Sequence, residues 1–266
     1  MAPVADRLDP ERIARTLDRL GTALGRPVRV LATTGSTNDD ARAAVAAGAP
    51  HGAAILADEQ TAGRGRSGSA WHSPPGEGVL LSVVLRPRLP AADLGPLGLV
   101  VGLAVARVVE RALPPAPALP VLVKWPNDVL VAGRKVAGVL VEARSRGSGP
   151  PEVVAGIGLN VHAARFPDAI AGRATSLRLL GCEGLDRSEL AALLIAELGR
   201  VLADFEQARV GPFLAELGAR DALRGRTVRV EGLVGTAAGL DELGRLLVRT
   251  AQGCVHAVVA GQVECL

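Results

Sequence analysis

The two lysines of this chain are the residues whose chemistry is easiest to single out. Lys124 and Lys135 are the only lysines among 30 lysines and arginines, and the chain has 32 glycines and no tyrosine. Such a composition is typical of GC-rich codons, which replace lysine, asparagine and tyrosine wherever a substitute serves. A lysine is a compact point charge that the planar fork of arginine does not replace where a carboxylate meets a phosphate. We therefore expect both lysines to act on such anions, although a cross-strand ion pair with Glu142 would also explain Lys124.

The residues that follow the first lysine add a candidate metal ligand. Segment 124–128 reads Lys-Trp-Pro-Asn-Asp and contains Asn127, one of only three asparagines. Asp128 supplies a hard oxygen that suits Mg²⁺, which binds through one or two carboxylates together with substrate phosphates. The alternative is that Asp128 is a turn residue after Pro126 and Asn127.

A glycine-rich segment, Gly63 to Gly68, formally matches G-x-G-x-x-G after a predicted strand. A dinucleotide site would need a helix to begin at the last glycine, but residues 73–76 read Ser-Pro-Pro-Gly. The pattern instead favours a mobile anion-binding loop, in which backbone N–H groups and the guanidinium groups of Arg64 and Arg66 bind phosphate oxygens. A solvated basic turn is the alternative.

Two further polar segments offer contacts to a small ligand. Segment 36–38 reads Ser-Thr-Asn at a predicted helix start, where the spacing of Ser36 and Asp39 resembles a capping box. The free N–H groups there suit a polar heterocycle or an anion, although capping alone would explain Ser36. Segment 156–160 reads Gly-Ile-Gly-Leu-Asn, so a flat ring could approach its backbone and contact Asn160, or the strand is simply kinked by glycine.

The composition excludes several other kinds of chemistry. A chain of 266 residues with 48% hydrophobic residues forms packed domains rather than a disordered protein. The net charge of +3 and the 2% aromatic content argue against nucleic acid as a partner. The three cysteines have no paired spacing and the four histidines have no metal-ligand spacing, so we expect neither disulfides nor a zinc site. A serine triad or cysteine nucleophile signature is also missing.

The sequence predicts no membrane segment. Residues Met1 to Pro10 lack a basic region followed by an apolar run, so we expect no signal peptide. The most apolar stretch, Leu94 to Val109, contains Pro96 and Arg107 and is shorter than the roughly 20 residues of a membrane span. We expect a soluble, cytoplasmic protein.

The elements that must position these residues follow from periodicity and turn residues. Helices are predicted at residues 10–24, 36–47, 97–113 and 188–205, and strands at 28–31, 53–58, 79–86, 121–125, 128–131, 135–143 and 153–161. Both lysines then fall in one hairpin unit, and residues 145–151 form a flexible loop. From Thr227 onward, short alternating runs between glycine turns predict a small β-barrel. We therefore predict an α+β protein with a catalytic domain at 1–221 and a second domain at 222–266.

Five segments taken in order resemble the biotin protein ligases over about residues 30–266. They are Gly35-Ser36-Thr37-Asn38, Glu59-Gln60-Thr61-Ala62-Gly63-Arg64-Gly65-Arg66, Lys124-Trp125-Pro126-Asn127-Asp128, Arg134-Lys135-Val136-Ala137-Gly138 and Gly156-Ile157-Gly158-Leu159-Asn160. The resemblance implies a mixed-sheet catalytic domain akin to class II aminoacyl-tRNA synthetases, followed by an SH3-like domain. The chain resembles the short form of the family, because its start is expected to be too short for the DNA-binding domain of bifunctional members. No DNA binding is expected.

The resemblance also implies an activity. The family joins biotin to ATP with Mg²⁺, giving biotinyl-5′-AMP and pyrophosphate, and passes the biotinyl group to one lysine of biotin carboxyl carrier protein. The implied protein holds no tightly bound prosthetic group and is a monomer or a homodimer.

Roles carry over to this chain by motif. The resemblance implies that the catalytic residues are Lys135, Lys124, Arg66 and Asp128, with Asp128 also helping to hold Mg²⁺. It implies a biotin site made of Ser36, Thr37, Asn38, Gln60, Gly63, Arg64, Gly65, Arg66, Lys135, Gly156 and Gly158. It implies that ATP and the adenylate contact Arg64, Arg66, Trp71, Lys124, Asn127 and Asn160.

This chain departs from the family pattern at one place, and two other functions are alternatives to the ligase interpretation. Many relatives have a basic residue where this chain has Ser69-Ala70 before Trp71, so loop closure would depend more on Arg64 and Arg66. A lipoate or octanoyl transferase of the same superfamily would need an apolar tunnel without the glycine-rich loop. A biotin-binding sensor without catalysis is the second rival, and the retained lysines count against it.

Overall fold

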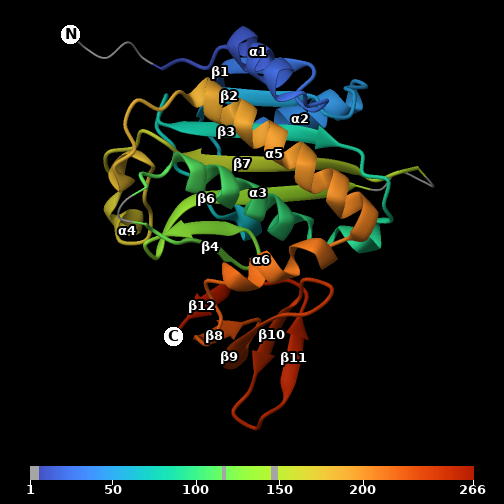
Figure 1. Ribbon diagram of the computed structural model, residues 1–266, viewed down its shortest axis with the longest axis vertical. Coiled ribbons are helices and arrows are strands. Elements are labelled where there is room, and N and C mark those ends of the chain that lie inside the picture. The colour runs from blue at the N-terminus through green and yellow to red at the C-terminus, as the bar shows by residue number, and fades with distance from the viewer. Residues whose placement is uncertain (1–5, 116–117, 145–148) are drawn as a thin grey trace.

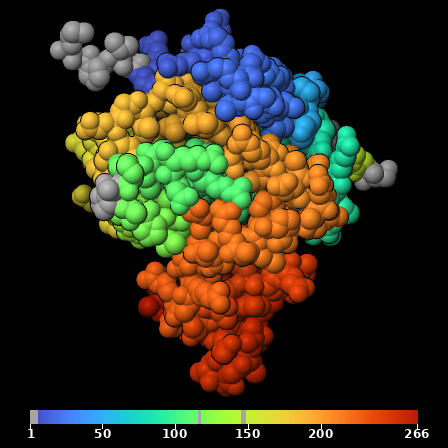
Figure 2. All heavy atoms as spheres, viewed as in Figure 1, coloured from blue at the N-terminus to red at the C-terminus, as the bar shows by residue number. Residues whose placement is uncertain are grey.

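The computed structural model describes residues 6–115, 118–144 and 149–266. The expectations for the first ten residues and for the loop at 145–151 lie partly outside these described residues. The chain forms a broad α/β body with a narrower β unit beneath it (Figures 1 and 2).

A seven-stranded mixed sheet forms the centre of the body. Its strands are β1 Val28–Thr34, β2 Ala54–Gln60, β3 Gly78–Leu85, β4 Val121–Lys124, β5 Asp128–Val131, β6 Arg134–Arg144 and β7 Glu152–Asn160. They lie in the order β1-β2-β3-β7-β6-β5-β4. The β1–β2 pair is parallel, and the other neighbouring strands are antiparallel. The predicted mixed sheet is confirmed, and its order places β3, β6 and β7 side by side.

Helices cover both faces of this sheet. They are α1 Pro10–Leu20, α2 Thr37–Ala46, α3 Leu97–Ala112, α4 Asp168–Ala171, α5 Arg187–Ala208 and α6 Leu214–Ala219, with 3₁₀ turns at Arg66–Gly68, Ala91–Leu94, Arg178–Leu180 and Gly211–Phe213. Side chains of a strand alternate between its two faces. Thus Leu56 packs with α3 and α5 in the main core, whereas Ile55 packs with α2 in a smaller core. The N-terminus of α2 therefore meets the sheet on the face opposite α5.

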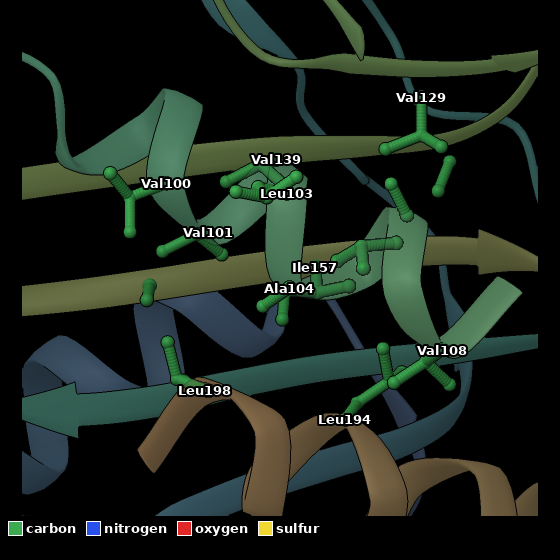
Figure 3. Close-up of a cluster of buried hydrophobic side chains, with 14 of the residues drawn as sticks. Val100, Val101, Leu103, Ala104, Val108, Val129, Val139, Ile157, Leu194 and Leu198 are labelled. Carbon is green, nitrogen blue, oxygen red and sulfur yellow. The ribbon is translucent and has the colours of Figure 1, made fainter. Parts of the chain in front are cut away.

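Helix α3 is the central helix of the main core. Figure 3 shows its side chains between Val139 and Ile157 of the sheet and Leu194 and Leu198 of α5. In the described part of the chain, the helical segment Ala91–Ala112 is long and apolar enough to cross a membrane by length and composition, and 67% of its most apolar window is buried in the fold. We expected the apolar stretch Leu94 to Val109 to be too short for a membrane span. The helical segment that contains it is longer than this stretch, so that expectation about length is wrong.

Two local predictions differ from the structure. The first helix ends at Leu20 rather than near residue 24, because Gly21 adopts a left-handed φ of 65° and caps it. The predicted capping box of the second helix is wrong, because the Ser36 side chain makes no capping hydrogen bond. The backbone N–H of Thr37 is bound instead by the side chain of Gln60, 2.8 Å away.

The C-terminal unit is a five-stranded antiparallel sheet. Its strands are β8 Thr227–Val230, β9 Leu233–Leu240, β10 Leu246–Arg249, β11 Val255–Val258 and β12 Val263–Cys265, in the order β11-β10-β9-β8-β12. The strand pairing leaves β11 and β12 as edges in the described residues, so the predicted closed barrel is not confirmed. Val228 and Val248 belong to the same buried cluster as the main sheet, so the two sheets share one core. The predicted boundary at residue 222 stays a prediction.

Candidate functional site

A cleft beside β6 and β7 gathers most of the predicted ligand-binding residues. It is lined by Ser36, Thr37, Asn38, Gln60, Arg64, Gly65, Arg66, Trp71, Leu80, Asn127, Lys135, Gly138, Val139, Leu140, Gly156, Ile157 and Gly158. An adjoining hollow shares Arg66, Asn127 and Lys135 and adds Lys124 and Asp128, together with residues 261–263 of the C-terminal unit. Residues from the start, middle and end of the chain therefore meet at one place.

A chain of hydrogen bonds fixes the helix start at the end of this cleft. The backbone N–H and hydroxyl of Thr37 donate to Gln60 Oε1 at 2.8 and 2.9 Å. Ser82, fully buried in β3, donates to Asn38 Oδ1 at 2.6 Å, and its oxygen lies 2.8 Å from the hydroxyl of Thr37. Sequence reasoning missed Ser82, although a single polar residue within the apolar strand Gly78–Leu85 was a usable signal.

Asn38 also connects the helix to β6. Its amide donates to Glu142 Oε2 at 2.8 Å and to the carbonyl of Leu140 at 3.3 Å. Glu142 additionally pairs with Arg42, and among the described residues no ion pair joins it to Lys124, so the alternative pairing of Lys124 with Glu142 is not found. A Cβ at Gly156 would lie 2.2 Å from Asn38 Oδ1, so glycine there makes room for this side chain.

The glycine-rich loop places two arginines at the cleft. Arg64 donates from its two terminal nitrogens, Nη1 and Nη2, to the carboxylate of Asp39 in α2, at 2.7 and 2.6 Å. The hydrogen bond from Arg64 lowers the pKa of Asp39 below its ordinary value. Arg66 donates to the carbonyl of Gly261 in the C-terminal unit at 3.3 Å. Burial lowers the pKa of Arg66, but an arginine starts so high that it keeps its charge.

The second lysine lies between a carboxylate and an aromatic ring. Lys135 Nζ is 2.6 Å from Asp128 Oδ1 and 5.5 Å from the centroid of the Trp71 ring. Lys124 is opposite Asp128 in the β4–β5 register. The two lysines and the aspartate therefore share one hollow, as the hairpin prediction requires.

Two glycines form a flat ledge beneath Trp71. A Cβ at Gly158 would lie 2.5 Å from the indole ring, and one at Gly138 would lie 3.1 Å from it and 2.9 Å from Lys135 Cε. The indole nitrogen of Trp71 is buried and has no hydrogen-bond partner among the described residues. A buried N–H without a partner costs about 1–3 kcal/mol. A ligand acceptor reaching this ledge would remove that cost.

Three predicted site residues serve the fold in this structure. The amide of Asn127 donates to the carbonyl of Val139 at 2.6 Å, and that of Asn160 donates to Thr175 at 2.9 Å. Asn160 is 5% exposed and lies outside the cleft lining, and Gly63 packs between Gln60 and Trp71. Their contacts with ligands stay predictions.

The residues at the hollow fit a magnesium ion only in part. Among the described residues, no group of three or more histidine, cysteine, aspartate or glutamate side chains could hold a metal by itself. Asp128 offers one carboxylate beside two lysines. This donor set suits Mg²⁺ that arrives with phosphate groups, since Mg²⁺ often uses one carboxylate and substrate phosphates.

The fold and the cleft define a class of protein. The cleft of this mixed α/β body offers polar groups at a helix start and a glycine ledge, and the adjoining hollow offers the positive charge of lysines and arginines. Residues 33–160 match the biotin/lipoate A/B protein ligase family.

Similar proteins narrow this class. The chain is 40% identical to a biotin–[acetyl-CoA-carboxylase] ligase of Mycobacterium tuberculosis, covering 97% of both chains. It is 36% identical to the enzyme of that name from Paracoccus denitrificans, over 84% of this chain and 95% of that one. The biotin protein ligase of Aquifex aeolicus in complex with biotin and ATP superimposes with a TM-score of 0.77 at 28% identity, over 91% of this chain and 99% of that one. This chain belongs to the biotin protein ligases and is an ATP-dependent enzyme of the ligase class.

Proposed function

We propose that this enzyme first converts biotin and ATP to biotinyl-5′-AMP and pyrophosphate, and then transfers the biotinyl group to a lysine of biotin carboxyl carrier protein. The observation that carries the proposal is the group of Lys135, Asp128, Arg66 and Lys124 around one hollow beside a polar, glycine-floored cleft. The names of its relatives, which are ligases for acetyl-CoA carboxylase, support the carrier as the acceptor.

The cleft at the start of α2 takes the polar head group of biotin. Ser36, Thr37 and Asn38 supply N–H and side-chain groups there, and Gln60 and Ser82 hold them in place. The glycines at 156 and 158 let the flat ring lie against β7, with the loop residues Gly63, Arg64 and Gly65 closing over it. In this arrangement the biotin carboxylate points toward Lys135.

The first step joins two anions. A carboxylate oxygen of biotin attacks the α-phosphorus of ATP, the bond to the bridging oxygen breaks, and pyrophosphate leaves with the electron pair. Lys135 neutralises both the carboxylate and the α-phosphate, while Arg66 and Lys124 neutralise the other phosphates. Mg²⁺ held by Asp128 and the phosphates would supply further positive charge.

The loop protects the product of this step. Biotinyl-5′-AMP is a mixed anhydride that water hydrolyses, so Arg64, Arg66 and Trp71 must cover it until the carrier arrives. The amine of the carrier lysine then attacks the biotinyl carbonyl carbon, and AMP leaves. Asn160 lies near the adenine and Asn127 contacts ATP, each through the amide groups that its one hydrogen bond to the backbone leaves available.

The finer architecture is part of the same proposal. We assign residues 6–221 of the described chain to a catalytic domain akin to class II aminoacyl-tRNA synthetases, and the five-stranded unit to an SH3-like domain. We also assign the protein to the cytoplasm, because the free cysteines Cys182, Cys254 and Cys265 suit a reducing compartment. A monomer or a homodimer is part of the same proposal.

The test uses biotin, Mg²⁺ and ATP labelled at the α-phosphate. We expect labelled biotinyl-5′-AMP on the enzyme and, after carrier is added, biotinylated carrier together with AMP. Binding of biotin without any adenylate would refute the ligase mechanism and favour the sensor alternative. The variant Lys135→Ala is the control, because it keeps the cleft but lacks the central cation.

A further inference from the structure

Arg187 is a buried charge outside the lining of the cleft and of the adjoining hollow. It is the first residue of α5 and has 0% of its surface exposed. Its guanidinium donates to Asp58 Oδ1 at 2.7 Å, to the carbonyl of Gly78 at 3.1 Å and, through Nε, to the carbonyl of Asp6 at 3.0 Å. Burying a charged group costs free energy unless hydrogen-bond partners surround it. The guanidinium group of Arg187 therefore depends on Asp58, Gly78 and Asp6 together.

The partners of Arg187 stand at the two ends of the loop that joins β2 to β3, residues 61–77, which contains the glycine-rich segment Gly63 to Gly68. Asp58 lies in β2 just before the loop, and Gly78 is the first residue of β3 just after it. A backbone hydrogen bond also joins the two ends of this loop, because the N–H of Gly76 donates to the carbonyl of Asp58 at 3.1 Å. We call these joined ends the base of the loop. The β2–β3 pairing ends at Ala57 and Leu80, and the guanidinium group of Arg187 holds the two chain segments together just beyond that pair, where the loop that carries Arg64, Arg66 and Trp71 begins and ends.

The end of the loop is also attached to β7. The carbonyl of Glu77 accepts hydrogen bonds from the N–H groups of Val161 and His162, at 3.0 and 2.8 Å. His162 Nε2 and the N–H of Arg187 both lie within 3.0 Å of Asp6 Oδ2. The base of the loop is thus fixed from the N-terminal segment, from β7 and from α5.

We propose that Arg187 is a positioning residue for the ligation reaction. By holding Asp58 and Gly78 together, it fixes the separation and direction of the loop ends, and so determines how well the loop closes over biotinyl-5′-AMP. Arg187 touches no substrate. The expected effect of Arg187 on catalysis rests on the function proposed above, whereas its expected effect on the loop does not.

Asp58→Ala and Arg187→Lys weaken this clamp in different ways. Asp58→Ala removes one loop end from the guanidinium, and Arg187→Lys keeps the charge but reaches fewer partners. Glu197→Gln is the matched control, because Glu197 is 2% exposed in the same helix and binds three arginines without touching the loop. Unfolding midpoints of all variants report general loss of stability.

Two readouts are measured on the full chain. In ligand-free protein, trypsin cleavage after Arg64 or Arg66 is followed by mass spectrometry. In the complex, release of preformed labelled biotinyl-5′-AMP is followed by filtration. We expect both rates to rise by about tenfold in Asp58→Ala, which corresponds to roughly 1.4 kcal/mol, with a smaller rise in Arg187→Lys and none in Glu197→Gln.

Each outcome decides the proposal. Wild-type rates of cleavage and release in Asp58→Ala, or equal increases in Glu197→Gln, would overturn it. If the wild-type enzyme makes no adenylate, the proposed function fails, yet the cleavage rates still show whether Arg187 holds the loop.

Discussion

At the scale of single residues, the site depends on a few side chains that already hold one another. Asp128 holds Lys135 at 2.6 Å, and Asp39 holds Arg64 at 2.6 Å. Each cation is thus kept near the cleft by a carboxylate of the protein until a carboxylate or phosphate of the substrate competes for it. Positioned charge of this kind needs little reorganisation when the reaction occurs.

Lys135→Ala tests the central cation. We expect the rate of biotinyl-5′-AMP formation to fall by about a hundredfold or more, since one preorganised charge or donor is typically worth this much. The measurement is single-turnover formation of labelled adenylate at saturating biotin and ATP. Lys135→Arg is the comparison, and full activity in the alanine variant would remove Lys135 from the mechanism.

Gly156→Ala tests the space beside Asn38. The added Cβ would meet Asn38 Oδ1 at 2.2 Å, and the bonds of Asn38 to Ser82 and Glu142 leave it little freedom to move. We expect biotin to bind about tenfold more weakly or worse, measured by calorimetry. Gly102→Ala is the control, because its Cβ would make an ordinary 3.7 Å contact with Val123. Equal affinities in the two variants would contradict this role.

At the scale of elements, an ion network joins the helices behind the sheet. Glu197 of α5 lies 3.0 Å from Arg107 of α3, and Arg107 also binds Glu216 of α6 at 2.6 Å. Burial by itself would raise the pKa of Glu197, but the hydrogen bonds from Arg107 and Arg200 and the charge of Arg111 outweigh it and lower the pKa below 4.5. The network therefore joins α3, α5 and α6 to one another and touches no residue of the β2–β3 loop.

Glu197→Gln tests this network through pH. Because the folded protein lowers the pKa of Glu197, its carboxylate stabilises the fold fully above pH 4.5, the ordinary pKa, and loses that contribution as pH falls through the lower folded pKa. We expect the variant to lose about 1.5–3 kcal/mol at neutral pH, because the three arginines lose a charged hydrogen-bond acceptor but are themselves 27–57% exposed and stay solvated. Urea unfolding should then show a smaller further loss than wild type between about pH 5 and pH 3. An unchanged acid dependence would contradict this assignment.

At the scale of the whole molecule, the C-terminal unit completes the hollow that the lysines share. Trp125, which follows Lys124, is 4% exposed and donates its indole N–H to the carbonyl of Gly244 at 3.1 Å. Arg66 reaches Gly261 in the same unit. Turns of the five-stranded unit, which is the narrow lower part of the molecule in Figure 2, therefore contact residues next to the site.

Trp125→Phe tests this junction. The substitution leaves the carbonyl of Gly244 without its partner, and we expect a loss of about 1–3 kcal/mol in the free energy of unfolding. Trp71→Phe is the comparison, because it removes an indole N–H that has no partner among the described residues, and we expect no loss or a small gain in stability there. Urea titration of both variants without ligand is the measurement, and equal losses would show that the bond to Gly244 contributes nothing.

Much of the fold and part of the site follow from the sequence. Alternation and helical spacing predicted the strands of the main sheet and the long helices, and the turn at residues 132–134 predicted that both lysines lie in one hairpin unit. The first helix was drawn too long, because Gly21 was not recognised as its cap. The small β-barrel was predicted from short alternating runs. Such runs indicate strands, but they do not determine whether the strands at the two edges of the sheet pair with each other.

The sequence by itself determined the local elements and the chemistry of the loop and lysine segments, because periodicity, turn residues and charge act over short stretches of chain. Only the tertiary structure decided that Ser82 holds Asn38 and that Arg187 holds Asp58 and Gly78. It also decided that Asn127 and Asn160 bind the backbone. These contacts depend on the order of strands in the sheet and on which helix crosses which face, and that order is set by packing between residues far apart in the chain.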